Sequence, residues 1–352
     1  MFSEFVILDL STVLAGPSVA TFFAEQGAKV IKIENTNVPD VTRSWKLPSE
    51  NQDSAISTYF SSINYKKEYV QLNLKDATDH SEFLKLVATA DIVISNFKLG
   101  DEEKFGIQDS ELRKINPNLI CGKITGFGDD SDRVAYDLIL QAETGFMSMN
   151  GTPESGPVKM PVALIDVLAA HHLKEALLLA ILKLKTTGIA KTVTVSLYDA
   201  AICSLVNQAS NYLMENHIPK RIGSLHPNIA PYGEIFKTKD GDLITFAIGS
   251  DVHFSKLCSF LKLTDLIEQS DFEHNSSRVK NRERLQALLQ EKILQFTSHE
   301  ILSVMATENV PCGKINSLNE VFESEKAKTL IREEVIDGKI TKRVTSIAFK
   351  WK

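Results

Sequence analysis

The chain has 352 residues, of which 43% are hydrophobic and 24% are charged, and its formal net charge is −6 at pH 7. This length exceeds what one small core needs, so we expect two domains or one elaborated domain. The composition excludes disordered and fibrous proteins, and the acidic balance argues against non-specific nucleic-acid binding, which needs a basic surface. An anionic ligand would have to be held by locally clustered Lys and Arg.

Strands and helices alternate through the first third of the chain. An uninterrupted apolar run predicts a strand at 5–11, and further strands are predicted at 29–34, 68–74, 91–97 and 119–128. Helical spacing of apolar residues predicts helices at 15–28, 76–90 and 109–117. In the first of these helices, Ser18 is the expected N-cap and Gly27 the stop. This alternation predicts an α/β fold, a Rossmann-like domain with a mostly parallel sheet and helices on both faces.

The second half of the chain changes in texture. A long helix is expected over about 166–185, followed by another strand and helix within 188–214. Three prolines and two glycines in 217–233 indicate a linker or an active-site loop. A hairpin at 234–248 and amphipathic helices beyond it then predict a smaller α/β domain over 222–325. The large domain is expected to cover 1–205, with 328–352 returning to it.

The cysteines and the N-terminus bear on the compartment. There is no CxxC pair and no Cys/His grouping at metal-ligand spacing, which suits buried thiols in a reducing cytoplasm. The N-terminus lacks the basic region of a signal peptide, and the longest apolar run is too short to cross a bilayer. We expect a cytoplasmic soluble protein without a metal site or a membrane partner; the four cysteines are Cys121, Cys203, Cys258 and Cys312.

The opening strand, turn, helix and second strand, which ends in Glu34, resemble the start of a dinucleotide-binding fold. The turn, in "STVLAGPSVA", has one glycine where three are needed, so a Rossmann-like unit without NAD or FAD is favoured. No Gly-x-Ser-x-Gly nucleophile elbow occurs. Cations near strand ends favour a phosphorylated ligand, because such sheets bind ligands there; the alternative is a solvated rim. These cations are Lys32, Arg43, Lys46, Lys66, Lys67, Lys75, Lys98 and Lys104.

One acid, Asp166, stands just ahead of a long apolar helix in "PVALIDVLAAHHLKEALLLAIL". An acid in this place is ordinarily an N-cap, because it accepts a backbone N–H at the positive helix end. The apolar neighbours Ile165 and Val167 favour a partly desolvated carboxylate. With a reference pKa of about 3.9 it is expected to be ionised at pH 7, and it needs no base to act as a nucleophile. Both roles stay open on the residues alone.

A series of motifs runs almost from end to end of the chain. In order they include "VILDLSTVLAGPSVATFFAEQGAKVIKIE", "ADIVISNFKLG", "INPNLICGKITGFG", "AYDLILQAETG", "ALIDVLAAHHLKEALLLAIL", "GSLHPNIAPYGEIFKTKDGDLITFAIG" and "VPCGKINSLNEV". In this order and spacing the chain resembles the class III CoA-transferases, the family of formyl-CoA and carnitine CoA-transferases. The α-methylacyl-CoA racemases are close relatives of that family.

The resemblance places the family's nucleophilic aspartate at Asp166 and implies transfer of CoA from an acyl-CoA to a free carboxylic acid. The carboxylate attacks the thioester to give an acyl-aspartyl anhydride; CoA then forms an aspartyl thioester, from which the acceptor acid takes CoA. Each step passes through an oxyanion that needs N–H donors nearby. The loop that covers the site in some members corresponds to Gly223–Asn228, which keeps one glycine and is expected to be stiffer.

The resemblance also implies a CoA site, with CoA as substrate and no permanently bound cofactor. Arg43 matches an arginine near the nucleotide phosphates, and Asn96 and Phe97 match the "NF" that borders CoA. Arg and Lys supply charge-assisted bonds to phosphate. Leu72 and Lys75 fall where adenine is held, and Lys104 replaces a frequent arginine.

Tyr136 matches a tyrosine near the reacting centre and separates two activities. The racemases carry a histidine there, because moving a proton between faces needs two bases, and a phenol with a reference pKa of about 10 is a poor substitute. The transferase is therefore favoured over an acyl-CoA racemase or epimerase, and a CoA-binding protein without turnover is the third alternative. Leu14, where formyl-CoA transferases have glutamine, disfavours formate and oxalate. The family resemblance further implies an interlocked homodimer.

Overall fold

The computed structural model describes residues 2–350 and divides into two compact units, which are treated separately. The larger unit contains the chain up to Ser148, Val158–Pro219 and the part from Thr329 onward. The smaller unit contains Met149–Pro157 and Lys220–Lys328. The boundaries expected from the sequence concern independently folding domains and stay predictions.

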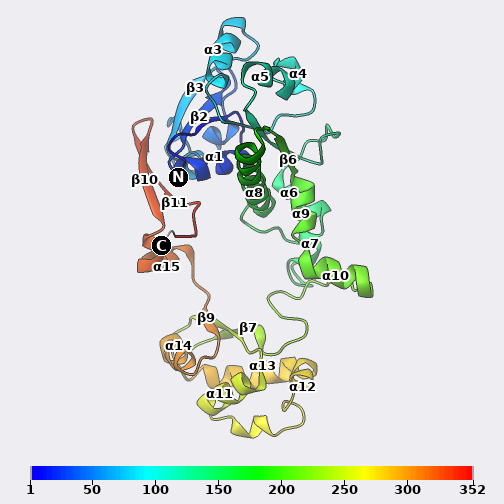
Figure 1. Cartoon of the computed structure of the whole chain (residues 1–352). Helices are drawn as coiled ribbons and strands as arrows, with labels where there is room; N and C mark the ends of the chain where they lie inside the picture. The colour runs from blue at the N-terminus through cyan, green and yellow to red at the C-terminus, as the bar shows by residue number, and fades with distance from the viewer. Residues whose placement is uncertain (1, 351–352) are drawn as a thin grey trace. The chain divides into compact units, whose positions relative to one another are not determined.

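The larger unit is built on a six-stranded sheet in the order β3-β2-β1-β4-β5-β6 (Figure 1). Every neighbouring pair of these strands is parallel. The order reverses at β1, which pairs with both β2 and β4, and such a switch point is where open α/β sheets bind ligands. The strands are β1 (Val6–Asp9), β2 (Lys29–Glu34), β3 (Lys67–Gln71), β4 (Ile92–Ser95), β5 (Ile120–Thr125) and β6 (Thr192–Ser196).

Both faces of this sheet are covered, so its strands are apolar without strict alternation. Ile7 packs into a core with α1 (Ala15–Glu25), α8 (Leu164–Thr187) and α9 (Leu197–Cys203). The next residue, Leu8, points to the other face and packs with α3 (Ala77–Val87) and α5 (Asp109–Ile115). The predicted fold class, a parallel α/β sheet with helices on both faces, is confirmed. The remaining helices of this unit are η1 (Val41–Ser44), α2 (Thr58–Ser62), α4 (Asp101–Lys104), α6 (Asp137–Glu143), α7 (Phe146–Met149) and α10 (Val206–Glu215).

Two helix starts differ from the sequence-based expectation. Helix α1 has Leu14 at its N-cap with no side-chain hydrogen bond, so the prediction that Ser18 caps it was wrong. Helix α8 has Ala163 at its N-cap, also without a side-chain bond, and Asp166 lies in its first turn. The prediction of Asp166 as the N-cap is therefore wrong. Both observed N-caps, Leu14 and Ala163, are apolar, and a prediction from the N-cap preferences of Ser and Asp does not select such residues.

The chain after the smaller unit returns to the larger unit as a hairpin of β10 (Ile331–Ile336) and β11 (Lys339–Val344), drawn orange to red in Figure 1. Its Ile336 packs with Ile56 and Phe60, and the Arg343 guanidinium donates to Glu25 over 2.7 Å. The hairpin pairs with itself and does not extend the six-stranded sheet.

The smaller unit carries an antiparallel sheet, β7-β8-β9, with its own apolar core. Phe236 and Phe246 lie on the strands and pack with helix residues such as Phe254 and Leu289. Within residues 2–350 no helix has the length and apolar character needed to cross a bilayer. The elements of this unit are β7 (Tyr232–Lys237), β8 (Leu243–Ala247), α11 (Asp251–Leu261), η2 (Thr264–Ile267), α12 (Asn275–Lys280), α13 (Arg282–Ile293), α14 (Ser298–Thr307), β9 (Cys312–Lys314), α15 (Leu318–Glu323) and α16 (Glu325–Lys328).

Candidate active site

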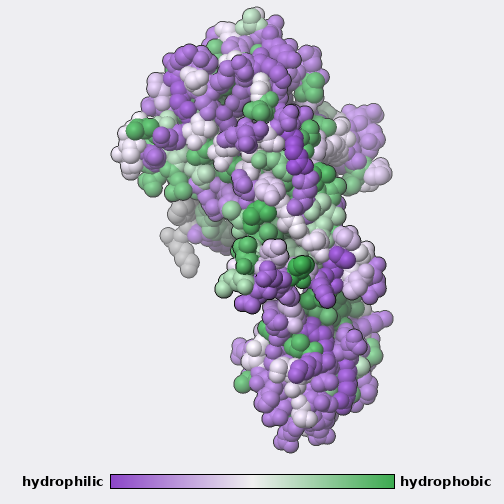
Figure 2. All heavy atoms as spheres, turned by 90° about the vertical axis from the view of Figure 1, so that its right-hand side faces the viewer, coloured by the Kyte–Doolittle hydropathy of each residue, from purple (hydrophilic) through white to green (hydrophobic). Residues whose placement is uncertain are grey.

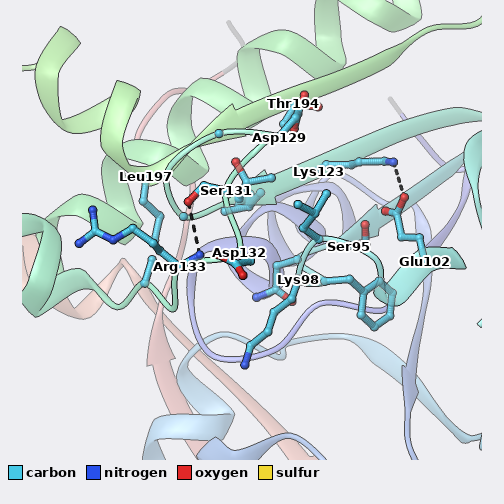
Figure 3. Close-up of a pocket in the computed structure, with 18 of the residues that line it drawn as sticks. Ser95, Lys98, Glu102, Lys123, Asp129, Ser131, Asp132, Arg133, Thr194 and Leu197 are labelled. Carbon is cyan, nitrogen blue, oxygen red and sulfur yellow. Dashed lines mark hydrogen bonds and ion pairs between the residues drawn. The ribbon is translucent and has the colours of Figure 1, made fainter. Parts of the chain in front are cut away.

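A cavity of about 460 Å³ opens in the larger unit where β1, β4, β5 and β6 end (Figure 3). Thr12 and Val13, which follow β1, form part of its wall, and Asn96 and Phe97, which follow β4, form another part. The loop that leads from β5 to α6 adds Tyr136. The cavity therefore lies at the switch point of the sheet, and it brings together three of the residues predicted from the sequence: Asn96, Phe97 and Tyr136.

Asn96 fixes the loop on the opposite wall of the cavity. Its Oδ1 accepts from the Thr12 N–H over 3.0 Å, and its Nδ2 donates to the Thr12 carbonyl over 2.9 Å. The next residue, Val13, has φ 72°, which strains a β-branched side chain, and its N–H donates to Asp40 Oδ1 over 3.4 Å. Asn96 thus holds protein backbone with both amide atoms and shapes the wall.

The part of the cavity lined by Lys123, Glu102 and Asp109 is polar, and the opposite charges of these residues partly cancel. Lys123 points toward Glu102 (Figure 3). Its Nζ lies 2.6 Å from Glu102 Oε2 and 3.0 Å from Asp109 Oδ1. Burial lowers and these two carboxylates raise the pKa of Lys123, and the net shift is upward. Lys98 and Arg133 also line the cavity, and among the described residues no ion pair involves Lys98. Because Lys123 and Arg133 are already paired with carboxylates, Lys98 is the cavity cation best able to bind an anionic ligand.

Arg43 is held by protein groups away from this wall. Its Nη2 donates to Glu34 Oε2 over 2.6 Å and its Nε donates to both oxygens of Glu34. The guanidinium stacks 3.9 Å from the Phe60 ring centroid and contacts Asp337 of the hairpin at 3.5 Å. Burial opposes and Glu34 favours the charged form, and the net effect raises the pKa of Arg43. A phosphate would have to compete with Glu34 for this arginine.

The cations expected at the strand ends include two that are buried. Lys32 and Lys67 have fully buried side chains, so their assignment to a ligand-facing rim was wrong. Lys67 Nζ donates to Asp9 Oδ2 over 2.8 Å, and Lys32 Nζ lies 3.2 Å from Asp40 Oδ2. Burial outweighs the attraction of Asp9 and lowers the pKa of Lys67 to about 8. These lysines hold the ends of β1, β2 and β3 together.

The residues predicted for adenine binding lie near Phe97 in chemically different settings. Leu72 is buried in the core beneath α3, and Lys75 is exposed, with its ammonium 5.8 Å from the Phe105 ring. Phe105 in turn stacks on Phe97 with centroids 5.4 Å apart. Lys104 is exposed and pairs with Asp101 at 2.9 Å. Lys75 is thus exposed beside two partly buried phenylalanines, which pack against the core that contains Leu72.

Asp166 is 7% exposed, and in the described part of the chain no hydrogen bond or ion pair involves its carboxylate. It does not line the cavity described above. Burial first, and the charge of Asp137 second, raise the pKa of Asp166 to about 7. The expectation that this acid is fully ionised at pH 7 was therefore wrong, because its water has been replaced by apolar side chains and a second carboxylate.

The hydrogen bond that caps α8 comes from another helix. Asp137 Oδ1 accepts from the Ile165 N–H over 2.8 Å, and Asp137 Oδ2 accepts from Gln141 Nε2 over 2.7 Å. Both side chains are buried. Asp137 was missed in the sequence, although it follows Tyr136 directly in "AYDLILQ". An acid beside an aromatic residue predicted to be at the reacting centre was the available signal.

Tyr59 is a second neighbour of Asp166 that sequence reasoning missed. Burial first, and the carboxylates of Asp166, Asp137 and Asp40 next, raise the pKa of Tyr59 to about 12, so its phenol stays protonated. Its ring packs edge-on against Trp45, with centroids 5.1 Å apart. The isolated tyrosine in "STYFSS" carries no motif that would have marked it.

The geometry defines an α/β protein with a ligand cavity at the switch point of a parallel sheet. In the first turn of α8 it has a buried carboxylate that is unpaired among the described residues. Among the described residues no cluster of three or more His, Cys, Asp or Glu is placed to hold a metal ion. The chain belongs to CoA-transferase family III, which it matches over residues 2–351.

Individual relatives agree with this family. The chain is 34% identical to a succinate–glutarate CoA-transferase of Agrobacterium fabrum, covering 90% of this chain and 80% of that protein. It is 31% identical to a succinyl-CoA:mesaconate CoA-transferase of Haloarcula marismortui, covering 90% and 81%. A crystal structure of a CAIB/BAIF family protein from Brucella suis has a TM-score of 0.85 and 34% identity over 98% of this chain and 91% of that one. The predicted enzyme class, a CoA-transferase acting between an acyl-CoA and a carboxylic acid, is confirmed.

Proposed function

We propose that this enzyme transfers CoA between short-chain dicarboxylic acids, with Asp166 as the covalent nucleophile. The observation that carries this proposal is a buried carboxylate at the start of a helix that is capped by another residue. Among residues 2–350 this carboxylate has no hydrogen-bond or ion-pair partner. The substrate class follows from relatives named for succinate, glutarate and mesaconate. Leu14, which precedes α1, agrees with an acyl chain longer than formate.

The reaction passes through two acyl-aspartyl anhydrides, one with the donor acid and one with the acceptor acid, and through an aspartyl-CoA thioester between them. Asp166 carboxylate attacks the acyl-CoA carbonyl, the C–S bond breaks, and CoA leaves as the thiolate. The thiolate attacks the aspartyl carbonyl of the anhydride, which gives an aspartyl-CoA thioester and the free donor acid. The acceptor carboxylate then attacks that thioester, and the released thiolate attacks the acceptor carbonyl, which forms the new acyl-CoA and restores Asp166. No water and no external base are consumed.

For CoA itself we propose the cavity wall around Asn96 and Phe97. Lys75 with Phe105 offers a cation and an aromatic face for adenine, above buried Leu72. Lys98 and Lys104 are exposed cations within reach of this wall for phosphate. Arg43 is assigned a supporting part, because its guanidinium already binds Glu34, and it would reach a phosphate only through a remaining N–H.

Tyr136, half exposed on the cavity wall, is proposed to contact the acyl group. A protonated phenol donates to a carbonyl or oxyanion but does not take a proton from an α-carbon near neutral pH. Tyr59, whose pKa is raised, offers a second phenolic donor near Asp166. This pair supports transfer over racemisation.

We further propose that the protein works as a homodimer in the cytoplasm. The last turn of α10 and the segment just after it carry exposed apolar residues: Leu213, Met214 and Ile218, which are 71–78% exposed. Figure 2 views the molecule from the side on which α10 lies in Figure 1, and it shows apolar side chains, in green, on this surface of the larger unit. Clusters of this kind on soluble proteins usually mark interaction surfaces. A second copy of the chain is the partner proposed for this face.

A donor and acceptor panel tests the function. Succinyl-CoA with glutarate or mesaconate is expected to yield the corresponding acyl-CoA, at rates well above those with formate or oxalate. Solvent deuterium appearing at the α-carbon of a branched acyl-CoA without an acceptor acid would instead indicate the racemase. Tight CoA binding with neither outcome would leave a binding protein, and either result would overturn the proposal.

A further inference from the structure

We propose that Asp137 is a positioning residue of the transfer reaction: from α6 it supplies the N-terminal hydrogen bond of α8, and so leaves both oxygens of Asp166 for the substrate. This inference rests on the proposed nucleophilic role of Asp166. Acids in the first turn of a helix commonly bond to its free N–H groups, and Asp166 has that place in α8. Within the part of the chain that the structure describes, its carboxylate nevertheless makes no such bond.

Asp137 and Gln141, one turn apart on α6, each hold a backbone N–H at or before the start of α8, and we call this pair of side chains the clamp. Asp137 accepts from the Ile165 N–H over 2.8 Å, and Gln141 Oε1 accepts from the Met160 N–H over 2.8 Å. The two side chains also bond to each other over 2.7 Å. Because residues four apart share a helix face, α6 holds the lead-in segment at Met160 and the first turn of α8 together. Both side chains are buried, at 8% and 1% exposure, so water competes little for these bonds.

The clamp also fixes the distance between two candidate reacting groups. Tyr136 is the N-cap residue of α6 and lines the cavity, and Asp137 follows it directly. Ile165, which Asp137 holds, directly precedes Asp166. A shift of the clamp would therefore move the phenol and the carboxylate relative to each other. Misplacement of a reacting group by about 1 Å can cost about 100-fold in rate.

Charge gives the same residue a second effect on Asp166. The carboxylate of Asp137, together with burial, raises the pKa of Asp166. Tyr59 on α2 also faces this pair. Further along α8 lie His171, His172, Lys174, Glu175, Lys183 and Lys185. The other elements that pack against α8 add Glu25 of α1, Glu143 of α6, Cys121 and Lys123 of β5, and Tyr198, Asp199 and Cys203 of α9. Lys123 is paired with Glu102 and Asp109.

Three variants separate the cap from the charge. Asp137→Asn keeps an oxygen that accepts from the Ile165 N–H but removes the charge. Asp137→Ala removes both the oxygen and the charge. Gln141→Leu removes the hydrogen bond to the Met160 N–H. Asp265→Asn, an exposed acid in the first turn of η2, is the matched control. The readouts are the rate at which hydroxylamine traps acyl-enzyme on succinyl-CoA across pH, and the dissociation constant for CoA.

Asp137→Ala is expected to slow trapping about 100-fold while the CoA dissociation constant stays within about twofold of wild type. Asp137→Asn should recover most of that rate and shift the acidic limb of its pH profile down by about one pH unit. Wild-type trapping in Asp137→Ala, or an Asp137→Asn protein as slow as Asp137→Ala with an unshifted limb, would overturn the inference. Should Asp137→Ala not fold, the Asp137→Asn profile alone decides. Wild type without any trapped adduct would instead overturn the nucleophilic role of Asp166.

Discussion

The surroundings of Asp166 destabilise its ionised form but leave its carboxylate oxygens available to a substrate. A carboxylate in apolar surroundings loses hydration, and a second carboxylate nearby adds repulsion, so its ionised form is destabilised. The structure does not offset this cost with a hydrogen bond, because Asp137 takes the helix N–H that would have served. A poorly solvated anion is a better nucleophile than a capped one. The same features that reduce its stability therefore prepare it for attack.

The raised pKa of Asp166 predicts an acidic limb in the pH profile of kcat/KM. Only the ionised form attacks, and the ionised fraction falls as pH drops through about 7. Below pH 6 the rate is expected to fall about tenfold per pH unit. Initial rates with succinyl-CoA between pH 5 and 8.5 check this. A plateau that persists down to pH 5 would mean that burial leaves the carboxylate with its ordinary pKa.

The same shift predicts that Asp166→Asn stabilises the protein. For an acid whose folded-state pKa lies above its unfolded value, the penalty grows as pH rises from about 4 and is complete above pH 7. A neutral amide avoids it, so the free energy of unfolding should rise by ~2–4 kcal/mol at pH 8 and by less at pH 5. Urea unfolding at both pH values measures this. Equal gains at the two values, or a loss at pH 8, would contradict the argument.

At the scale of elements, buried ion pairs join the strands that lie next to the site. Lys67, at the start of β3, bonds to Asp9, at the end of β1, and also to two backbone carbonyls and Asn64. Lys32 on β2 donates to the Ser11 carbonyl over 2.7 Å. The loop that forms one cavity wall thus starts from a buried network of ion pairs and hydrogen bonds.

Removing one lysine from this network is expected to be costly. Lys67→Met removes the cation nearest to buried Asp9, at 2.8 Å, and among the described residues leaves it only Lys32 at 4.0 Å. Breaking a buried ion pair in this way destabilises proteins by about 3–5 kcal/mol. Lys29→Met provides the control, because Lys29 pairs with Glu68 at an exposed site on the same sheet, where such pairs contribute about 0–1 kcal/mol. Denaturant unfolding of both variants measures the difference. Similar losses in the two would show that the buried network is not special.

At the scale of the whole molecule, the exposed apolar end of α10 matters most. Leu213 and Met214 are more than three-quarters exposed, which is unusual for neighbouring large apolar residues. The proposed homodimer would bury them, and the apolar area removed from water would stabilise it.

Sedimentation is therefore expected to give twice the chain mass of 39.1 kDa. Leu213→Glu with Met214→Glu should shift this mass toward the single chain, whereas Lys220→Glu, outside the helix, should leave it unchanged. A wild-type protein that sediments as a single chain at micromolar concentration would refute the dimer.

How far the sequence predicts this molecule depends on the range of the contacts. The parallel sheet was predictable because buried strands such as "IVIS" of β4 are apolar segments that are recognisable from the local sequence. The cap of α8 was not, because Asp137 and Ile165 are 28 residues apart in the chain. The local sequence around Lys67 is typical of an exposed cation, because its partner Asp9 lies 58 residues away in the chain. The shifted pKa of Asp166 likewise arises from neighbours that no local pattern reveals.

The central claim is that Asp166 forms the covalent intermediate. Incubation with succinyl-CoA, quenching with hydroxylamine and peptide mass spectrometry test it directly. A hydroxamate is expected on Asp166, formed only in the presence of acyl-CoA and lost in Asp166→Asn. An unmodified Asp166 peptide from an enzyme that still transfers CoA, or a hydroxamate on another acid, would contradict it.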